Sequence, residues 1–237
     1  MFISSIDTRK VLSSAFAQQA PHWIKENGMN ITIIGAGNMG RALVKQLSGA
    51  GHQVTVTARD LDKASQLASE FPRTTAAEAG SAVGADSVVI VATGYNDAVP
   101  ALQALGDLAG KIVIDITNPL TADYMDLTIG HSTSAAEQIA AALPGALVVK
   151  AFNTVFAQVL AEGPQLAGKQ VPVFYASDSE RAGQTARALI ESTGFAAIDA
   201  GPLKNARYLE PVGGLNIYFG YGAGHGTTVA PSWIGLN

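Results

Sequence analysis

The sequence predicts an α/β protein of the Rossmann type, with a doubly wound, mainly parallel sheet and a small C-terminal extension. Strand-length apolar runs alternate with helix-like segments along most of the chain. These runs are continuously apolar, which is typical of parallel strands covered by helices on both faces. The first run ends at Ile34 and leads into a glycine-rich turn that opens a helix. The 237 residues are enough for one large domain with a smaller appended portion.

Each expected element follows from apolar patterning between turn signals. Strands are expected at 30–34, 53–57, 87–93, 111–117, 147–151, 171–176 and 196–200. Helices are expected at 41–48, 61–71, 76–83, 98–108, 134–143 and 180–192. Asp60 and the segment 177–179 are expected to cap the helices that follow them. A last helix is predicted because Tyr208, Val212, Leu215 and Phe219 recur at helical spacing, despite Pro211 and a Gly-Gly pair.

These elements divide the chain into three parts. Residues 29–155 form the expected dinucleotide-binding Rossmann domain, and residues 156–237 form a smaller α/β and helical portion. Residues 1–28 are interpreted as an N-terminal extension. The alternative for this segment is a secretory leader, because Arg9 and Lys10 precede a short apolar stretch that two serines interrupt.

Composition excludes several classes of protein. The net charge of −4 and the pI near 5.5 argue against a nucleic-acid or anionic-membrane surface. There is no Cys, so disulfides, zinc–thiolate sites, iron–sulfur clusters and thiol nucleophiles are excluded. No apolar run reaches the roughly 18 residues of a membrane helix. No metal-ligand spacing or Ser-His-Asp set is visible. We expect a cytoplasmic protein without a metal site, a nucleic-acid partner or a membrane partner.

The turn Gly35-Ala36-Gly37-Asn38-Met39-Gly40 has the G-x-G-x-x-G spacing in the required strand–turn–helix context. Gly35 permits a tight turn, Gly37 leaves room for a pyrophosphate to approach the backbone, and Gly40 allows close packing of helix and strand. The helix that begins at Asn38 and Met39 offers unpaired N–H groups to the anion. The motif predicts a dinucleotide site.

The end of the second strand selects between the two nicotinamide dinucleotides. NAD-specific folds place an acidic residue there to bind the ribose 2′-hydroxyl, and Val54–Arg59 has none. Thr57 offers a hydroxyl, Arg59 a planar guanidinium for a 2′-phosphate, and Lys63 a further charge one turn later. These residues favour NADP(H). The alternative is that Arg59 and Lys63 are solvated surface charges.

Five segments together carry a family resemblance: 29–40, 114–120 (Ile-Asp-Ile-Thr-Asn-Pro-Leu), 134–137 (Ser-Ala-Ala-Glu), 149–154 (Val-Lys-Ala-Phe-Asn-Thr) and 199–203 (Asp-Ala-Gly-Pro-Leu). Through them the chain resembles the NADP oxidoreductases that depend on the deazaflavin coenzyme F-420. The chain is also similar to the cytosolic reductase domain of the six-transmembrane epithelial antigen metalloreductases, which pass hydride from NADPH to a flavin.

The resemblance implies an enzyme in which NADP(H) lies across the carboxyl ends of the strands and a second redox ring stacks beside the nicotinamide. The matching positions are Thr93 and Gly94, then Asn118 and Pro119, then Ala151, Phe152, Asn153 and Thr154. Coenzyme F-420 is the expected hydride acceptor, with FMN or FAD next. Two alternatives remain open: an NADPH-dependent reductase of a small imine or keto substrate, and a non-catalytic NADP(H)-binding sensor.

A few further residues keep two interpretations each. Phe152 is either a core aromatic or part of the nicotinamide wall. His131 either faces a substrate or lies in solvent, and Lys204 and Arg207 either contact an acceptor phosphate or are solvated. The C-terminal apolar stripe predicts a homodimer, unless it merely covers the edge of the sheet.

Overall fold

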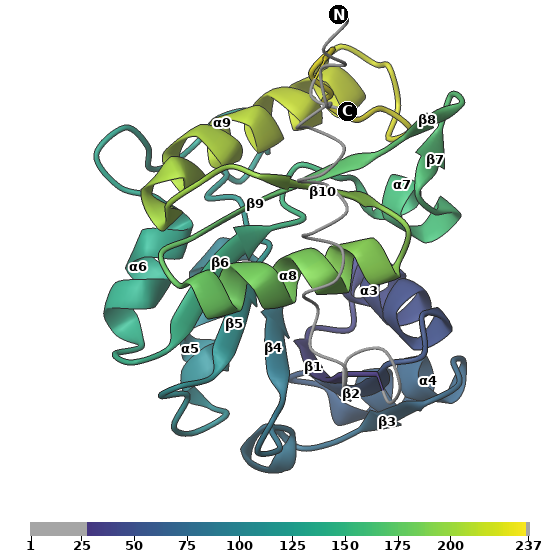
Figure 1. Ribbon diagram of the computed structural model, residues 1–237, viewed down its shortest axis with the longest axis vertical. Coiled ribbons are helices and arrows are strands. Elements are labelled where there is room, and N and C mark those ends of the chain that lie inside the picture. Colours follow the sequence, from purple (N-terminus) through teal and green to yellow (C-terminus); the bar gives the residue numbers. More distant parts are fainter. Residues whose placement is uncertain (1–27, 236–237) are drawn as a thin grey trace, which may run out of the picture.

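The computed structural model describes residues 28–235, so the predicted N-terminal extension lies outside the described residues except for Gly28. An eight-stranded sheet forms the centre of the molecule (Figure 1). Its strands are β1 (Asn30–Ile34), β2 (Gln53–Thr57), β3 (Thr74–Ala76), β4 (Val88–Val91), β5 (Ile112–Asp115), β6 (Leu147–Ala151), β9 (Pro172–Ser177) and β10 (Ala196–Asp199). A separate two-stranded hairpin joins β7 (Gln165–Leu166) to β8 (Lys169–Gln170).

The α-helices are α3 (Asn38–Gly49), α4 (Leu61–Ser69), α5 (Tyr95–Gln103), α6 (Ala135–Ala142), α7 (Ala157–Glu162), α8 (Glu180–Ser192) and α9 (Ala206–Ile217). Short 3-10 turns occur at 79–81 and 203–205, and α9 continues into a π-helical turn at 218–222. None of the helices in residues 28–235 is long and apolar enough to cross a membrane.

The strand order is β10-β9-β6-β5-β4-β1-β2-β3. All neighbouring pairs are parallel except β6 and β9. The chain moves outward from β1 through β2 to β3 and then returns to β4 on the other side of β1. This reversal places a crevice between the carboxyl ends of β1 and β4, the position where open α/β sheets bind their ligands. The predicted Rossmann-type fold is confirmed.

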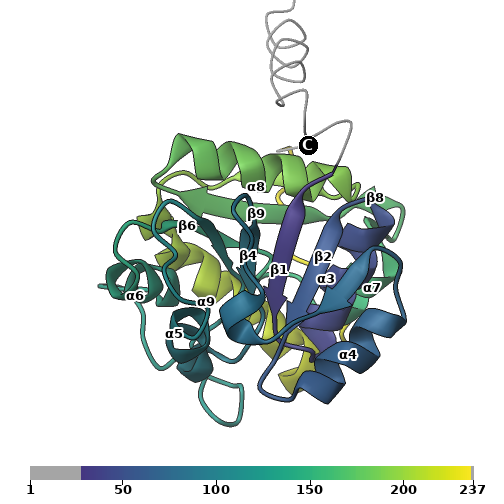
Figure 2. The same cartoon turned by 90° about the horizontal axis from the view of Figure 1, so that it is seen from below.

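Helices cover both faces of the sheet, as continuous apolar strands require (Figure 2). One hydrophobic layer joins the strands to α3, α4, α7 and α8, and includes Leu43 and Leu189. The opposite layer joins them to α5 and α6, and includes Leu102 and Ile139. Helix α9 begins beside this second layer, where Ala206 is buried.

The C-terminal portion continues the same sheet, because β9 pairs with β6 and β10 pairs with β9. Helix α9 forms as predicted. The helix expected at 76–83 is wrong: Thr74–Ala76 pairs with β2 as strand β3, and only a 3-10 turn follows. Pairing to β2 takes Ala76 into the sheet, and Gly80 weakens the helical preference of the residues that follow.

Candidate functional site

The glycine-rich turn after β1 has the geometry that dinucleotide binding requires. Gly35 has φ of +118°, and a methyl group on it would lie 2.6 Å from the carbonyl oxygen of Ala92. A methyl group on Gly40 would collide with the carbonyl oxygen of Gly35, so α3 packs directly on the turn. A methyl group on Gly37, by contrast, would meet nothing within 4 Å. Gly37 therefore faces open space where a phosphate can approach the backbone.

The first turn of α3 completes an anion site. Gly37 is its N-cap and supplies no side-chain oxygen, and the first turn carries no acidic residue. The N–H groups of Asn38, Met39 and Gly40 precede the first intrahelical bond, which Arg41 donates to Gly37. Unpaired N–H groups and the positive end of the helix dipole attract a pyrophosphate. These residues fit the predicted dinucleotide.

The end of β2 presents a cation and no free acid. Arg59 is exposed and has no hydrogen-bond or ion-pair partner within residues 28–235. Asp60 caps α4 as predicted, because its Oδ1 accepts from the backbone N–H of Lys63 at 3.2 Å. The Lys63 ammonium lies 3.6 Å from Asp60 Oδ2 and is largely solvated. Thr57 is only 2% exposed, so its hydroxyl is less accessible than the sequence suggested.

The carboxyl ends of β4, β5 and β6 lie along the same edge of the sheet. Gly94 caps α5 without a side-chain bond, which gives a second open helix N-terminus beside Thr93. Asn118 and Asn153 form a reciprocal pair: Asn118 Nδ2 donates to the carbonyl oxygen of Asn153 at 2.8 Å, and Asn153 Nδ2 donates to Asn118 Oδ1 at 2.9 Å. Asn153 Nδ2 also donates to the carbonyl oxygen of Leu209 at 2.9 Å, which ties the edge to α9.

Other predicted pocket residues lie inward. Ala151 and Phe152 are 0% and 1% exposed and pack in the core, so neither residue faces the surface at this edge. For Phe152 the core interpretation is therefore the correct one. Its φ of +60° is unusual for a bulky residue, and such backbone strain is concentrated at functional sites. Pro119 and Thr154 are also buried.

Unpartnered buried oxygens mark this edge. Within the described residues, four buried side-chain polar atoms lack a hydrogen-bond partner, and three of them are Thr117 Oγ1, Asn153 Oδ1 and Thr154 Oγ1. Buried polar groups in native proteins are almost always satisfied, so an exception needs a ligand or an ordered water. The loops after β5 and β6 thus carry buried oxygens that the other described residues leave unsatisfied.

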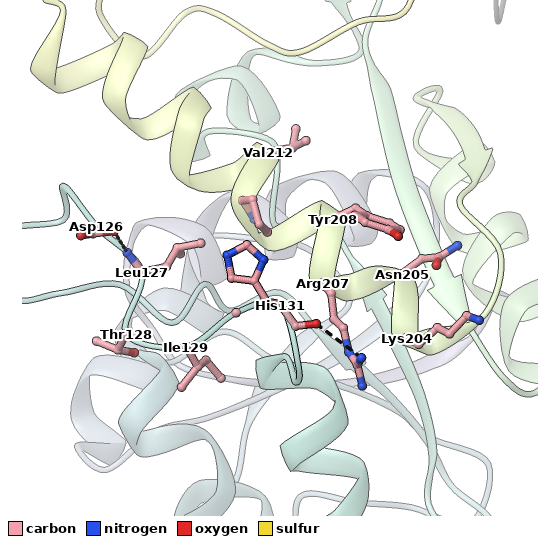
Figure 3. A pocket seen from close by; sticks show the side chains of 12 residues that line it. Asp126, Leu127, Thr128, Ile129, His131, Lys204, Asn205, Arg207, Tyr208 and Val212 are labelled. Carbon is pink, nitrogen blue, oxygen red and sulfur yellow. Dashed lines mark hydrogen bonds between the residues drawn. The ribbon is translucent and has the colours of Figure 1, made fainter.

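A cavity of about 1030 Å³ lies beside these loops, between the segment 126–131 and residues 204–212 (Figure 3). It brings together three residues that the sequence singled out: His131, Lys204 and Arg207. Arg207 makes a bidentate pair with Glu137, with Nε–Oε2 and Nη2–Oε1 distances of 2.8 and 2.6 Å. This pair lowers the pKa of Glu137. Lys204 and His131 are exposed at the cavity.

Sequence reasoning missed a buried ionic cluster beneath this edge. Lys150 is 0% exposed, and its ammonium lies 2.8 Å from both Asp115 Oδ2 and Glu210 Oε1. Burial raises the pKa of Glu210, against the attraction of Lys150. Nearby Tyr95 has a raised pKa, caused first by burial and then by the charges of Glu210 and Asp115. The sequence does contain one indication of this cluster, because Asp115 and Lys150 each place a charged residue within an otherwise apolar strand.

The fold and its carboxyl edge define a Rossmann-type dinucleotide-binding protein. The family model described as "NADP oxidoreductase coenzyme F420-dependent" matches residues 30–119. The F420-dependent NADP reductase of Methanothermobacter thermautotrophicus is 32% identical over 209 residues, which cover 80% of this chain and 88% of that protein. The chain belongs to the F420-dependent NADP oxidoreductase family.

Two further similarities support this placement. The crystal structure of a proposed F420-dependent NADP-reductase from Arthrobacter sp. FB24 superposes with a TM-score of 0.76 at 30% identity, covering 85% of this chain and 97% of that one. Metalloreductase STEAP3 of Rattus norvegicus is 31% identical over 190 residues, covering 80% of this chain but 37% of that protein. The chain spans between 35% and 41% of the length of the metalloreductases that it matches.

Proposed function

We propose that the protein transfers hydride between NADPH and a tricyclic deazaflavin or flavin, with coenzyme F-420 the expected acceptor and FMN or FAD next. The observation that carries the proposal is the meeting of two features at one edge of the sheet. The phosphate loop at Gly37 is open, and the loops after β5 and β6 contact both walls of a large cavity, Pro119 through Thr128 and Asn153 through Gly213.

The cavity has room for a planar acceptor. Its volume of about 1030 Å³ is at the upper end of the range for ligand pockets, roughly 300–1,000 Å³. Both of its walls are anchored to the loop after β5: Thr128 donates its backbone N–H to the carbonyl oxygen of Pro119 at 2.7 Å, and α9 contacts Asn118 through Gly213. A ring in this cavity would be held by Leu127, Val212 and Tyr208, with Lys204 available for an anionic substituent.

When bound, the nicotinamide supplies the hydride, and the transfer needs no protein acid or base at that step. The protein's part is to bind, orient and exclude water. Backbone groups of the phosphate loop and Arg59 hold the dinucleotide, and the paired Asn118 and Asn153 fix the loops on which the two rings would meet. Orientation of this kind contributes a large share of the rate in two-substrate reactions.

An anaerobic stopped-flow assay tests the proposal by following NADPH oxidation with F-420, FMN and FAD offered separately. We expect at least one of these acceptors to be reduced far faster with the protein than without it. A panel of cyclic imines and keto acids serves as the comparison. Reduction of one of these, with no acceleration for any tricyclic acceptor, would replace the proposal with a small-substrate reductase. Tight NADPH binding with no turnover of either set would leave the sensor alternative.

A further inference from the structure

The cluster of Lys150, Asp115 and Glu210 lies beneath the carboxyl edge of the sheet and joins β5, β6 and α9, three of the elements that build the proposed site. Lys150 is the penultimate residue of β6, and Asp115 is the last residue of β5. Glu210 lies on α9, the helix that forms one wall of the cavity. Three elements far apart in the sequence thus converge on one ammonium group.

Each side of the Lys150 ammonium group meets an oxygen, through two hydrogen bonds and one ion pair. The ammonium group of Lys150 has three N–H donors, and three oxygens surround it: Asp115 Oδ2, Glu210 Oε1 and the carbonyl oxygen of Thr117. Glu210 also accepts from the backbone N–H groups of Ala135 and Ala136 at 3.0 and 3.3 Å. The positive end of α6 therefore balances the second carboxylate of the cluster.

The same bonds fix the peptide that carries Asn118. Asp115 Oδ1 accepts from the N–H of Thr117 at 2.8 Å, while Lys150 binds the carbonyl oxygen of Thr117. The N–H group and the carbonyl oxygen of Thr117 are thus both hydrogen-bonded, and these bonds fix the orientation of the next residue, Asn118. One turn beyond Glu210 on α9, Gly213 packs against the Asn118 side chain. The ion pair of Glu210 and the packing of Gly213 together fix the position of α9 relative to the loop that carries Asn118.

We propose that the Lys150–Asp115–Glu210 cluster is a positioning device, which sets the spacing between the acceptor wall on α9 and the nicotinamide-side loop at Asn118. The inference rests on the proposed function of this edge. A cluster that served stability alone would be replaceable by apolar side chains of similar volume. A positioning cluster could not be replaced in this way without loss of activity, because hydride transfer depends on the reacting atoms approaching to about 3–3.5 Å.

The main variant is Glu210→Gln, with Glu191→Gln as the matched control. Glu191 undergoes the same chemical change but pairs with Arg187 on the exposed surface of α8. For Glu210→Gln we expect kcat for acceptor reduction to fall about 10- to 100-fold. The Kd for NADPH, measured by fluorescence titration, should stay within about twofold of the wild-type value, because the phosphate loop and Arg59 lie on the other half of the sheet. The control should match wild type in both measurements.

A second variant keeps the test decisive if Glu210→Gln does not fold. The triple variant Asp115→Asn, Lys150→Met, Glu210→Gln removes all three charges together and leaves no buried charge unpaired. We expect it to fold, to bind NADPH and to show the same loss in kcat. Wild-type kcat in either folded variant would overturn the proposal, and so would a loss of kcat matched by an equal weakening of NADPH binding.

Hydrogen exchange provides a readout that does not depend on the acceptor. Amides of α9 and of Thr117 and Asn118 should exchange faster in Glu210→Gln with NADPH bound than in the NADPH-bound wild type, while those of α3 stay unchanged. Wild-type protein that reduces no tricyclic acceptor would refute the proposed function, and exchange would then still report on the spacing. Unchanged exchange at both segments would refute the positioning role.

Discussion

Gly213 of α9 faces the side chain of Asn118 so closely that a methyl group on Gly213 would lie 2.7 Å from Asn118 Oδ1 and 2.9 Å from the carbonyl oxygen of Asn153. The neighbouring Gly214 has more room, because the nearest atom to a methyl group there would be a Leu127 methyl carbon at 3.6 Å. Two adjacent glycines in one helix therefore have different roles. Only Gly213 is required for α9 to reach the proposed site.

We expect Gly213→Ala to lower the free energy of unfolding by about 1–3 kcal/mol through overpacking, and to slow acceptor reduction. The paired Asn118 and the backbone of Asn153 cannot both move away. Gly214→Ala is the matched control and should be neutral or stabilising by up to about 1 kcal/mol, because alanine favours the helix. Chemical denaturation of both variants checks this, and equal effects at the two positions would contradict it.

The phosphate loop offers a second matched pair. Gly37→Ala should leave the melting temperature near the wild-type value and weaken NADPH binding sharply, because the methyl group occupies open space that the pyrophosphate needs. Gly40→Ala should instead lower the melting temperature, because its methyl group would collide with Gly35. Thermal melting with and without NADPH separates the two effects. A Gly37→Ala variant that binds NADPH normally would refute the placement of the dinucleotide.

Arg59 is expected to select NADPH over NADH. Its guanidinium would donate charge-assisted hydrogen bonds worth roughly 1.5–3 kcal/mol to the 2′-phosphate. Arg59→Ala should therefore weaken NADPH binding by about 10- to 150-fold and leave NADH binding nearly unchanged. Arg187→Ala, which removes an exposed arginine on α8, is the control. An equal loss of affinity for NADPH and NADH would show that Arg59 does not recognise the 2′-phosphate.

His52 should make stability depend on pH. Its Nδ1 accepts from the N–H of Met29 at 2.9 Å, and its Nε2 lies 2.8 Å from Ser192 Oγ, so the ring is neutral with the proton on Nε2. Burial lowers its pKa below the ordinary 6.5. The unfolded chain therefore binds the proton first as pH falls, and stability present above pH 6.5 is lost below it.

Denaturant titrations of wild type and His52→Gln between pH 7.5 and 5.5 measure this contribution. The wild-type free energy of unfolding should fall over this interval, and the variant should show a flatter dependence. Parallel curves for the two proteins would mean that His52 is not the group responsible.

The outer face of α9 predicts a homodimer. Leu215 and Phe219, which lie outside the cavity, are 53% and 42% exposed, so this part of the stripe does not cover the edge of the sheet. We expect a second copy of the chain to cover it, because exposed aromatic and aliphatic patches mark interfaces. Light scattering at micromolar concentration should give a dimer, and Leu215→Lys should give a monomer, whereas Ser65→Lys on α4 should not. A wild-type monomer would refute the prediction.

The sequence by itself determined the fold class, and it also supplied the residues of the proposed cofactor half of the site. Strand and helix periods, together with the spacing of Gly35, Gly37 and Gly40, depend on contacts between residues near in sequence. The lack of an acidic residue directly after β2 and the presence of Arg59 can likewise be recognised from neighbouring residues in the sequence. The last helix was also predictable, because apolar residues at helical spacing outweighed its Pro and Gly residues.

Only the tertiary structure decided what lies on the acceptor side. Phe152 belongs to the core rather than to a wall, and β3 is a strand because β2 supplies its hydrogen-bonding partner. Glu210 meets Lys150 across 60 positions of sequence, and no local pattern predicts that pairing. A buried charge is stable only where distant groups complete its hydrogen bonds, so the cluster exists only once the sheet, α6 and α9 have assembled.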